Sequence, residues 1–554
     1  MTSTTDSTRR GTGVRGTPSG AAPVPTKQPD PKSITPMQAG KGFRVVSDPS
    51  TWLPVKTDIL DSKGEVVGHR QIRDRSLLGR EAGFDRIIDF APGTPVQRIY
   101  LDETPRTDAI ETPSWPGSEV RTLVAQGPSK NRIDLTIVGD GYTEAEKDKF
   151  FLDAKRITEE LFGHDTFKSY LPLFNVHAVF VPSKQSGIGD GRSKDTALGC
   201  YRHPQHRQAV MPGNSSAAKR ATQLAPDVDY PIIVANDKFY GGLGGTFAVT
   251  TSAPLNITTV LRHELGHNFG RVGEEYDGGQ VYDGANHSSS SSNVPWQHFV
   301  KGQTPVHSAK LLHISAPWKN LGGGEWQTSV TVPDNAKSTL LDFSSLGFDK
   351  KEDVELLVDG KSVPYDGKFN YDRNFYKVKL ELAPGRHTIT FKDRAGDGNN
   401  ILSRLAVYGL PETFPSDRAT VGAFQSYREG GGSGGFRPTE SDCLMRDMQL
   451  THFCPACQEN MWRNFLKEVS LIDGVERNNG MVTAKLVPLG DERLKVEWID
   501  PTGKSRPELA GKREWQPVAG DVGKWKLQVR FVSEEVKDPK QAAWTVHEAP
   551  FEIA

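Results

Sequence analysis

The sequence of 554 residues predicts an α+β fold in which several β-rich parts accompany one mixed part. A strand, turn and helix pattern begins at Ile133, and a helix-forming segment surrounds His263. Two later regions show only short alternating runs typical of strands. Because one hydrophobic core rarely serves a chain this long, we expect roughly three to five domains.

The N-terminal part is predicted to contain two different segments. Residues 1–40 are rich in Thr, Ser, Gly and Pro and contain few large apolar side chains, so we expect them to be disordered. Residues 41–120 contain short alternating runs such as 43–46 and 96–100, which predict a small β-domain.

Residues 125–304 are predicted to form a mixed sheet with helices. A buried strand at 133–138 is followed by Thr143 and Glu146 at capping-box spacing, and apolar residues then recur at helical intervals. Further strands are expected at 174–181 and 230–236. The glycine-led stretch 244–250 is either an edge strand that pairs with an extended substrate or an ordinary strand of the sheet.

The remaining sequence predicts two β-sandwiches around a short return to the first domain. Residues 305–412 contain regularly spaced strand patterns and are interpreted as an inserted β-sandwich. Residues 413–467 would complete the mixed domain, and residues 468–554 predict a second sandwich with an Ig-like pattern.

The most informative motif is His263-Glu264-Leu265-Gly266-His267. Histidines four residues apart lie on one face of a helix, so both imidazoles can bind the same metal ion. Glu264 is placed to act as a general base on a water molecule, as in zinc peptidases. Two surface histidines on an amphipathic helix are the alternative, and the apolar run before the motif argues against it.

A third ligand is expected shortly after this helix. In the metzincin pattern a glycine ends the helix in a left-handed turn, and we expect Gly270 to take that position. The usual ligand position is Gly273, which has no side chain. Glu274 and Glu275 are the nearest donors, and an oxygen ligand suits zinc.

Several segments in the same order resemble the IgA-peptidase-type metallopeptidases among the metzincin-like zinc enzymes. They are 138–143, 174–177, His263 to His267 with Glu275-Tyr276, and 437–439 before Cys443-Leu444-Met445-Arg446. The resemblance covers about 125–300 and 413–465. It implies a metzincin-like fold, bound Zn²⁺, a protein or peptide substrate and an extracellular location, although the sequence as given begins without the apolar stretch of a secretory signal.

The resemblance also implies individual roles. It favours Glu275 as the third zinc ligand, after His263 and His267, because an acidic-Glu-Tyr triplet follows the helix in this family. It implies that Met445 forms a turn beneath the metal. Tyr276 and Tyr427 are candidates for stabilising the transition state, with packing as the alternative for each.

The four cysteines leave several interpretations open. Cys443, Cys454 and Cys457 lie close in sequence, whereas Cys200 stands apart. They could form a structural disulfide or buried thiols, a redox pair, or a second zinc site that recruits Cys200 or His452.

Composition narrows the classes of partner. The net charge of −1 and the absence of a long basic stripe argue against nucleic acid, and no apolar run is long enough for a membrane span. The oligomeric state stays open.

The motif and the family resemblance together predict a zinc endopeptidase. The alternative is a catalytically vestigial surface protein that binds proteins or glycans through its sandwiches.

Overall fold

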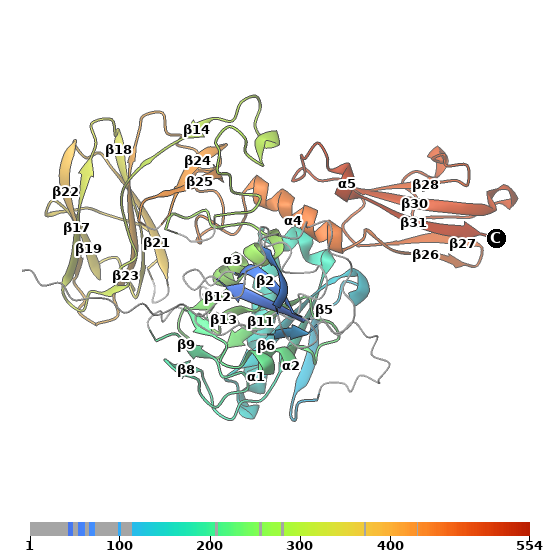
Figure 1. Cartoon of the computed structure of the whole chain (residues 1–554), viewed down its shortest axis with the longest axis horizontal. Coiled ribbons are helices and arrows are strands. Elements are labelled where there is room, and N and C mark those ends of the chain that lie inside the picture. Colours follow the sequence, from blue (N-terminus) through green and yellow to red (C-terminus); the bar gives the residue numbers. More distant parts are fainter. Residues whose placement is uncertain are drawn as a thin grey trace, which may run out of the picture. The chain divides into compact units, whose positions relative to one another are not determined.

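The computed structural model describes residues 114–554, apart from 205–208, 254–256, 279–281, 370–372 and 429, together with four upstream strands (Figure 1). Contacts between residues divide the chain into two compact units. The first comprises Met1–Arg86 and Ala91–Thr107, and the second comprises Ile87–Phe90 and Asp108–Ala554. The segment 1–40, where we expected disorder, lies outside the described residues.

The first unit contains an antiparallel four-stranded sheet in the order β3-β2-β1-β4. Its strands are β1 (Gly42–Ser47), β2 (Pro54–Leu60), β3 (Val66–Gln71) and β4 (Arg98–Tyr100). All four lie within the region 41–120 that the sequence predicts to be rich in β-structure.

The second unit is built around a mixed six-stranded sheet in the order β12-β13-β11-β6-β7-β5. The four central strands are parallel, and the edge strands β5 and β12 run antiparallel to their neighbours. The strands are β5 (Glu119–Val124), β6 (Ile133–Asp140), β7 (Phe174–Phe180), β11 (Tyr230–Ala235), β12 (Gly242–Leu243) and β13 (Ala248–Thr251).

Helices cover both faces of this sheet. The helices α1 (Lys147–Gly163) and α3 (Ile257–Gly270) share one apolar core with Ile137 of β6. The helix α2 (Ser215–Thr222) packs on the other face, against the core that contains Val138. Because neighbouring residues of a strand point to opposite faces, the strand β6 supplies both cores.

Local sequence explains where α1 begins. Thr143 and Glu146 form the expected capping box, which satisfies backbone N–H groups before the helix. The α1 side chains Phe150, Ile157 and Leu161 are then buried at helical spacing. A small separate sheet contains β8 (Gly189–Asp190), β9 (Tyr201–Arg202) and β10 (Val210–Met211).

The region after α3 contains two sheets that share a hydrophobic core including Phe343, Tyr376 and Phe391. The first consists of β15 (Lys310–Ser315), β16 (Lys319–Asn320), β18 (Ser338–Leu346), β21 (Asn374–Leu380) and β23 (Ile401–Leu410). The second consists of β17 (Glu325–Val332), β19 (Val354–Val358), β20 (Lys361–Ser362) and β22 (Gly385–Asp393). This arrangement is compatible with the expected sandwich.

The chain then returns to the mixed sheet through three paired strands and a helix. These elements are β14 (Val306–His307), β24 (Val421–Tyr427), β25 (Ser433–Thr439) and α4 (Pro455–Glu468). The helix α4 packs against α3, and its Trp462 and Phe465 lie in the same core as Phe269. Short 3-10 helices occur at Ser129–Asn131, Glu144–Glu146, Lys168–Leu173, Gln297–Phe299, Pro507–Leu509 and Ala519–Asp521.

The C-terminal region contains two three-stranded sheets and a short helix. The first sheet consists of β26 (Ile472–Asn478), β27 (Met481–Leu486) and β29 (Glu514–Trp515). The second sheet consists of β28 (Leu494–Ile499), β30 (Gly523–Phe531) and β31 (Val546–Ile553). The short helix is α5 (Ala542–Thr545). Trp462 of α4 stacks against Phe531 with ring centroids 4.3 Å apart, so the apolar core continues from the mixed sheet into this region.

The α+β prediction is confirmed at the level of mixed sheets with a few helices in a β-rich chain. The predicted domain borders and the Ig-like pattern stay predictions. No helix among the described residues is both long enough and apolar enough to cross a membrane.

A buried ion pair links the mixed sheet to the C-terminal region. Arg132, which is 4% exposed, donates from both terminal nitrogens to Asp473 of β26 at 2.7 and 2.9 Å. The guanidinium also donates to the Gln126 carbonyl at 2.9 Å. Removing the carboxylate would leave this buried cation without its anion.

We therefore predict that Asp473→Ala lowers the free energy of unfolding by about 3 to 5 kcal/mol. The control is Asp491→Ala, whose side chain is 85% exposed beside Arg513, and its loss should stay within about 1 kcal/mol. Urea unfolding of the two variants measures both values. Equal losses would show that the Arg132 pair contributes no more than a surface pair.

Candidate active site

The helix α3 places His263 and His267 on the same side. Their rings stand nearly perpendicular, with centroids 4.9 Å apart. On the other side of the helix, Leu261, Leu265 and Phe269 are fully buried in the core. The amphipathic alternative with two exposed histidines is wrong, because His263 is only 4% exposed.

Hydrogen bonds to backbone carbonyls orient both imidazoles. His267 Nδ1 lies 2.7 Å from the Val272 oxygen, and His263 Nδ1 lies 3.5 Å from the Leu444 oxygen. A carbonyl accepts, so each Nδ1 carries a proton and each Nε2 is the nitrogen that faces Glu274 and is available to a metal ion. This is the arrangement that histidine ligands of metal ions commonly adopt.

Glu274 completes the group. Its two carboxylate oxygens lie 3.1 Å from His263 Nε2 and 3.2 Å from His267 Nε2. One ligand atom from each of the three residues lies within 4.8 Å of the others. Glu275, which the sequence favoured as the third ligand, faces away from the histidines toward three cysteines. Glu274, and not Glu275, therefore lies with the two histidines.

The donor set fits a zinc ion. Two ligands with bonds of about 2.0 to 2.1 Å at a tetrahedral angle lie about 3.3 Å apart. The observed separations of 3.1 and 3.2 Å are close to that value. Glu274 Oε2 is also buried and makes no well-aligned hydrogen bond, although His263 Nε2 lies 3.1 Å away. A cation bound between the two atoms would explain this arrangement. Three protein ligands are the number typical of a catalytic zinc site.

The charges of these groups are strongly coupled. Burial raises the pKa of Glu274, but His263 and His267 outweigh burial and hold it below its usual value. Burial likewise lowers the pKa of His267, while Glu274 and then Glu264 reverse this effect and raise it to about 9. The group as a whole therefore favours an ionised Glu274.

Glu264 lies beside the group in a space that a glycine leaves open. A Cβ atom at Gly244 would come 2.2 Å from Glu264 Oε2. Burial raises the pKa of Glu264 above its usual value, and the charges of His263 and His267 oppose this rise. A carboxylate with a raised pKa is a better proton acceptor near neutral pH.

The group opens into a pocket of about 420 Å³. One wall comes from the segment between β11 and the end of the site turn, and it includes Tyr240, His263, Glu264, Glu274 and Tyr276. The facing walls come from the predicted insertion and from the segment after Met445. The size and depth of the pocket suit a side chain or short peptide segment.

Arg373 is a pocket residue that sequence reasoning missed. It donates to Tyr240 Oη at 3.2 Å and to Ser344 Oγ at 3.3 Å, and its guanidinium lies 5.0 Å from the Phe375 ring centroid. It lies about a hundred positions from the motif, and no local pattern in the sequence distinguishes it from other arginines.

The two candidate tyrosines lie in different places in the structure. Tyr276 lines the pocket, and its ring lies 6.1 Å from that of His263. Tyr427 instead donates to the Ala309 carbonyl and lines a different, much smaller cavity. The glycine-led stretch 244–250 follows the edge strand β12, and its last residues belong to β13, which pairs with both β11 and β12. Its role with substrate stays a prediction.

Met445 packs beneath α3. A Cβ atom added at Gly266 would lie 2.9 Å from Met445 Sδ and 3.0 Å from Phe453. The absence of a side chain at Gly266 therefore allows the methionine to approach the helix between the two histidines. The position agrees with the role that the family resemblance implied.

The left-handed turn after α3 lies one residue later than expected. Arg271 has φ of +48°, whereas Gly270 does not have a positive φ. A Cβ atom at Gly270 would lie 3.0 Å from Met461 of α4. Gly270 is thus explained by close helix packing rather than by backbone conformation.

The segment after the turn is fixed by hydrogen bonds to distant residues. The Glu275 N–H donates to the Met445 oxygen at 3.0 Å, and Arg446 donates to the Glu275 oxygen at 3.1 Å. Asn286, also missed by sequence reasoning, donates to Gly273 and accepts its N–H. These contacts hold Glu274 in place.

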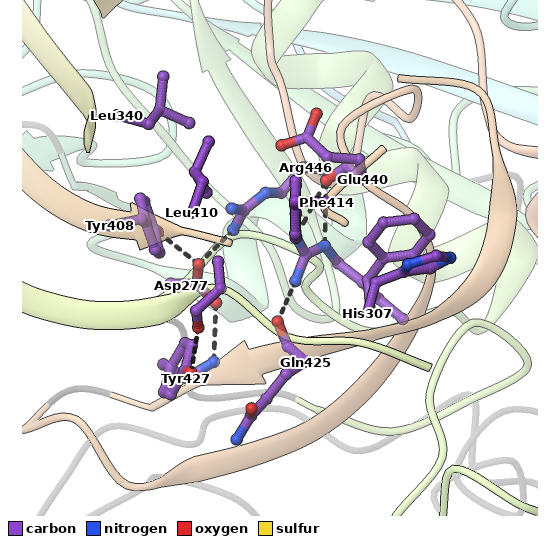
Figure 2. Close-up of a pocket in the computed structure, with 13 residues that line it drawn as sticks. Asp277, His307, Leu340, Tyr408, Leu410, Phe414, Gln425, Tyr427, Glu440 and Arg446 are labelled. Carbon is purple, nitrogen blue, oxygen red and sulfur yellow. Dashed lines mark hydrogen bonds and ion pairs between the residues drawn. The ribbon is translucent and has the colours of Figure 1, made fainter. Parts of the chain in front are cut away.

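Asp277 extends this anchoring into the predicted insertion. Figure 2 shows its carboxylate between Arg446, Tyr408 and Tyr427. Arg446 forms an ion pair with it at 2.8 Å, Tyr408 donates at 2.5 Å, and the Tyr427 N–H donates at 2.7 Å. Tyr408 belongs to β23, so this carboxylate ties the sandwich to the candidate site.

In a comparison with known protein families, residues 122–331 match a family of peptidases. The matching family is described as IgA Peptidase M64, and the match covers residues 122–331 of this chain. The matched segment contains His263, Glu264, His267 and Glu274, and it ends before Met445 and the cysteine group. This match indicates a peptidase, a hydrolase of peptide bonds.

Other comparisons are less informative. No curated protein matches the chain. An exo-β-1,3-galactanase structure from Phanerochaete chrysosporium is 21% identical over 18% of this chain and 27% of that one, with a TM-score of 0.14. The CBM35 structure from Cellvibrio japonicus Abf62 is 12% identical over 18% of this chain and 86% of that one, with a TM-score of 0.14.

The contact between Gly266 and Met445 generates a stability prediction. Gly266→Ala should lower the free energy of unfolding by about 1 to 3 kcal/mol, because the added carbon overpacks a closed core. Gly163→Ala, in helix α1, meets no atom within 4 Å, so it should be neutral or stabilise by up to about 1 kcal/mol. Chemical denaturation compares the two. An unchanged stability in Gly266→Ala would show that Met445 has room to move.

Proposed function

We propose that the protein is a zinc-dependent endopeptidase in which His263, His267 and Glu274 bind the metal and Glu264 is the general base. The convergence of three ligand atoms within 4.8 Å is the observation that carries this proposal. The match of residues 122–331 to a peptidase family supports it independently.

Zinc bound at this site would polarise the scissile carbonyl and acidify an attacking water molecule. Glu264 accepts the proton of that water and transfers it to the nitrogen of the leaving group. Its raised pKa suits both steps, because the carboxylate must gain and then release the proton. The glycine at position 244 leaves room for the carboxylate to turn between the two partners.

Tyr276 is the proposed donor to the charge that develops on the carbonyl oxygen. Burial, followed by the nearby Glu274 and Glu264, raises its pKa well above the usual value. The phenol therefore keeps its proton and can donate a hydrogen bond. Arg373, on the facing wall, adds positive charge to the same pocket.

The proposed substrate class is protein. The family description names IgA, but the facing walls of the pocket come largely from residues after position 331, beyond the matched segment. Specificity depends on such walls. The vestigial binding protein remains the alternative that the following experiments distinguish.

Removal of the base should abolish most activity. We expect Glu264→Gln to lower kcat/KM by at least about 10² to 10⁴-fold, with zinc content unchanged. Cleavage of a proteome-derived peptide library by the wild type, this variant and the exposed control Glu412→Gln measures the effect and also reports cleavage sites. Zinc-loaded wild type that cleaves no peptide or protein would favour the binding protein.

Removal of the third ligand should affect the metal first. Glu274→Ala leaves two imidazoles, so the zinc content after dialysis should fall by one ion per chain, while Glu412→Ala should match the wild type. Elemental analysis against protein concentration provides the measurement. If Glu274→Ala kept the full zinc content and affinity, Glu274 would not be the third ligand, and Glu275 would be the next residue to test.

A further inference from the structure

A second group of possible metal ligands lies on the other side of the Glu274-Glu275 dipeptide. It consists of Glu275, Cys443, Cys454 and Cys457, whose ligand atoms all lie within 4.8 Å of one another. The side chains of Glu275 and the three cysteines are fully buried. Neither Cys200, which lies in the core on the α2 face, nor His452, which pairs with Asp442, takes part.

The distances in this group match a tetrahedral zinc site. With Zn–S bonds of about 2.3 Å and Zn–O bonds of about 2.0 to 2.2 Å, two sulfurs should lie about 3.8 Å apart and a sulfur and an oxygen about 3.6 Å apart. Cys443 Sγ and Cys457 Sγ are separated by 3.9 Å. Cys454 Sγ and Cys457 Sγ lie 3.6 and 3.5 Å from Glu275 Oε1.

The N-terminus of α4 favours negatively charged ligands in this group. Cys454 is the N-cap residue of α4, and Cys457 lies in its first turn. The N-terminus of a helix carries partial positive charge and favours thiolates over thiols. Asn286 donates to Glu275 Oε1 at 3.0 Å, which orients this carboxylate in the same way that hydrogen bonds orient other metal ligands.

The group is poorly explained without a cation. Glu275 Oε2 is buried and has no hydrogen-bond partner among the described residues, a condition that is costly for a carboxyl group. A disulfide does not account for the group either, because the four cysteines are free and the Cys443 and Cys457 sulfurs lie 3.9 Å apart.

We propose that Glu275, Cys443, Cys454 and Cys457 bind a second zinc ion. On binding, the three thiols and the carboxyl group of Glu275 would release their protons to solvent. Four protein ligands in a closed, buried site leave no position for water, which is typical of a structural zinc and not of a catalytic one. Soft thiolate ligands in this geometry favour zinc over magnesium or calcium.

This second zinc would position the first. Glu275 is the neighbour of Glu274, and Cys443 lies two residues before Met445, so the same ion would hold both the segment that carries the third catalytic ligand and the turn beneath α3. Glu275 and the cysteines are therefore proposed as positioning residues rather than catalytic residues.

Counting metal ions tests the proposal. The wild-type protein should contain two zinc ions per chain, and Cys457→Ala should contain one. The matched control is Cys200→Ala, which removes a buried free thiol outside the group and should keep both ions. A wild type that holds a single zinc under conditions of excess metal would overturn the proposal.

Spectroscopy separates the two sites and does not depend on activity. After exchange with cobalt, a thiolate-to-metal charge-transfer band should be present in the wild type and in Glu274→Ala but absent from Cys457→Ala. If Glu274→Ala also lost the band, the two groups of ligands would not be separate metal sites. Failure of Glu274 as a catalytic ligand would leave the band and the cysteine result unchanged.

If Cys457→Ala does not fold, X-ray absorption of the wild-type protein decides. Three sulfurs shared between two zinc ions predict an average of about 1.5 sulfur neighbours per zinc at about 2.3 Å. A zinc spectrum with only nitrogen and oxygen neighbours would overturn the proposal.

Discussion

The pairing of the segment after α3 with the turn at Met445 is the interaction on which the site depends. The Glu275 N–H donates to the Met445 oxygen, and Arg446 returns a hydrogen bond to the Glu275 oxygen, although the two segments are 171 residues apart. Without this pairing, Gly273 and its neighbours would be a polar loop with few buried contacts. With it, Glu274 is held against the two histidines by backbone geometry, and little entropy remains to be lost when a metal binds.

The adjacent residues Glu274 and Glu275 point to opposite sides of this segment. Successive side chains of an extended backbone point in opposite directions, so one position faces α3 and the next faces α4. A change of one residue in register would therefore exchange a histidine environment for a cysteine environment. The dipeptide joins two chemically distinct groups, and its two carboxylates differ accordingly: Glu274 has a lowered pKa, whereas burial raises the pKa of Glu275 well above its usual value.

The sequence was sufficient for features that depend on local spacing and insufficient for those that depend on distant contacts. Helical spacing predicted the convergence of His263 and His267, and the capping box at Thr143 predicted where α1 would follow. The choice between Glu274 and Glu275 could not be made this way, because it depends on which side chain faces α3 after pairing with Met445. Arg373 was missed for the same reason, since it directly precedes the strand β21 and lines the pocket although it follows the motif by about a hundred residues.

The long separation between the two halves of the site has a consequence during translation. A ribosome that has synthesised α3 and Glu274 has still to make the sandwich strands, the Met445 turn and the cysteines of α4. Until those residues emerge, the nascent chain lacks the partners that fix Glu274, the facing walls of the pocket and most of the second ligand group. For the peptidase that we propose, cleavage of neighbouring proteins by unfinished chains is thereby disfavoured, since the proposed centre is completed by segments made long after α3.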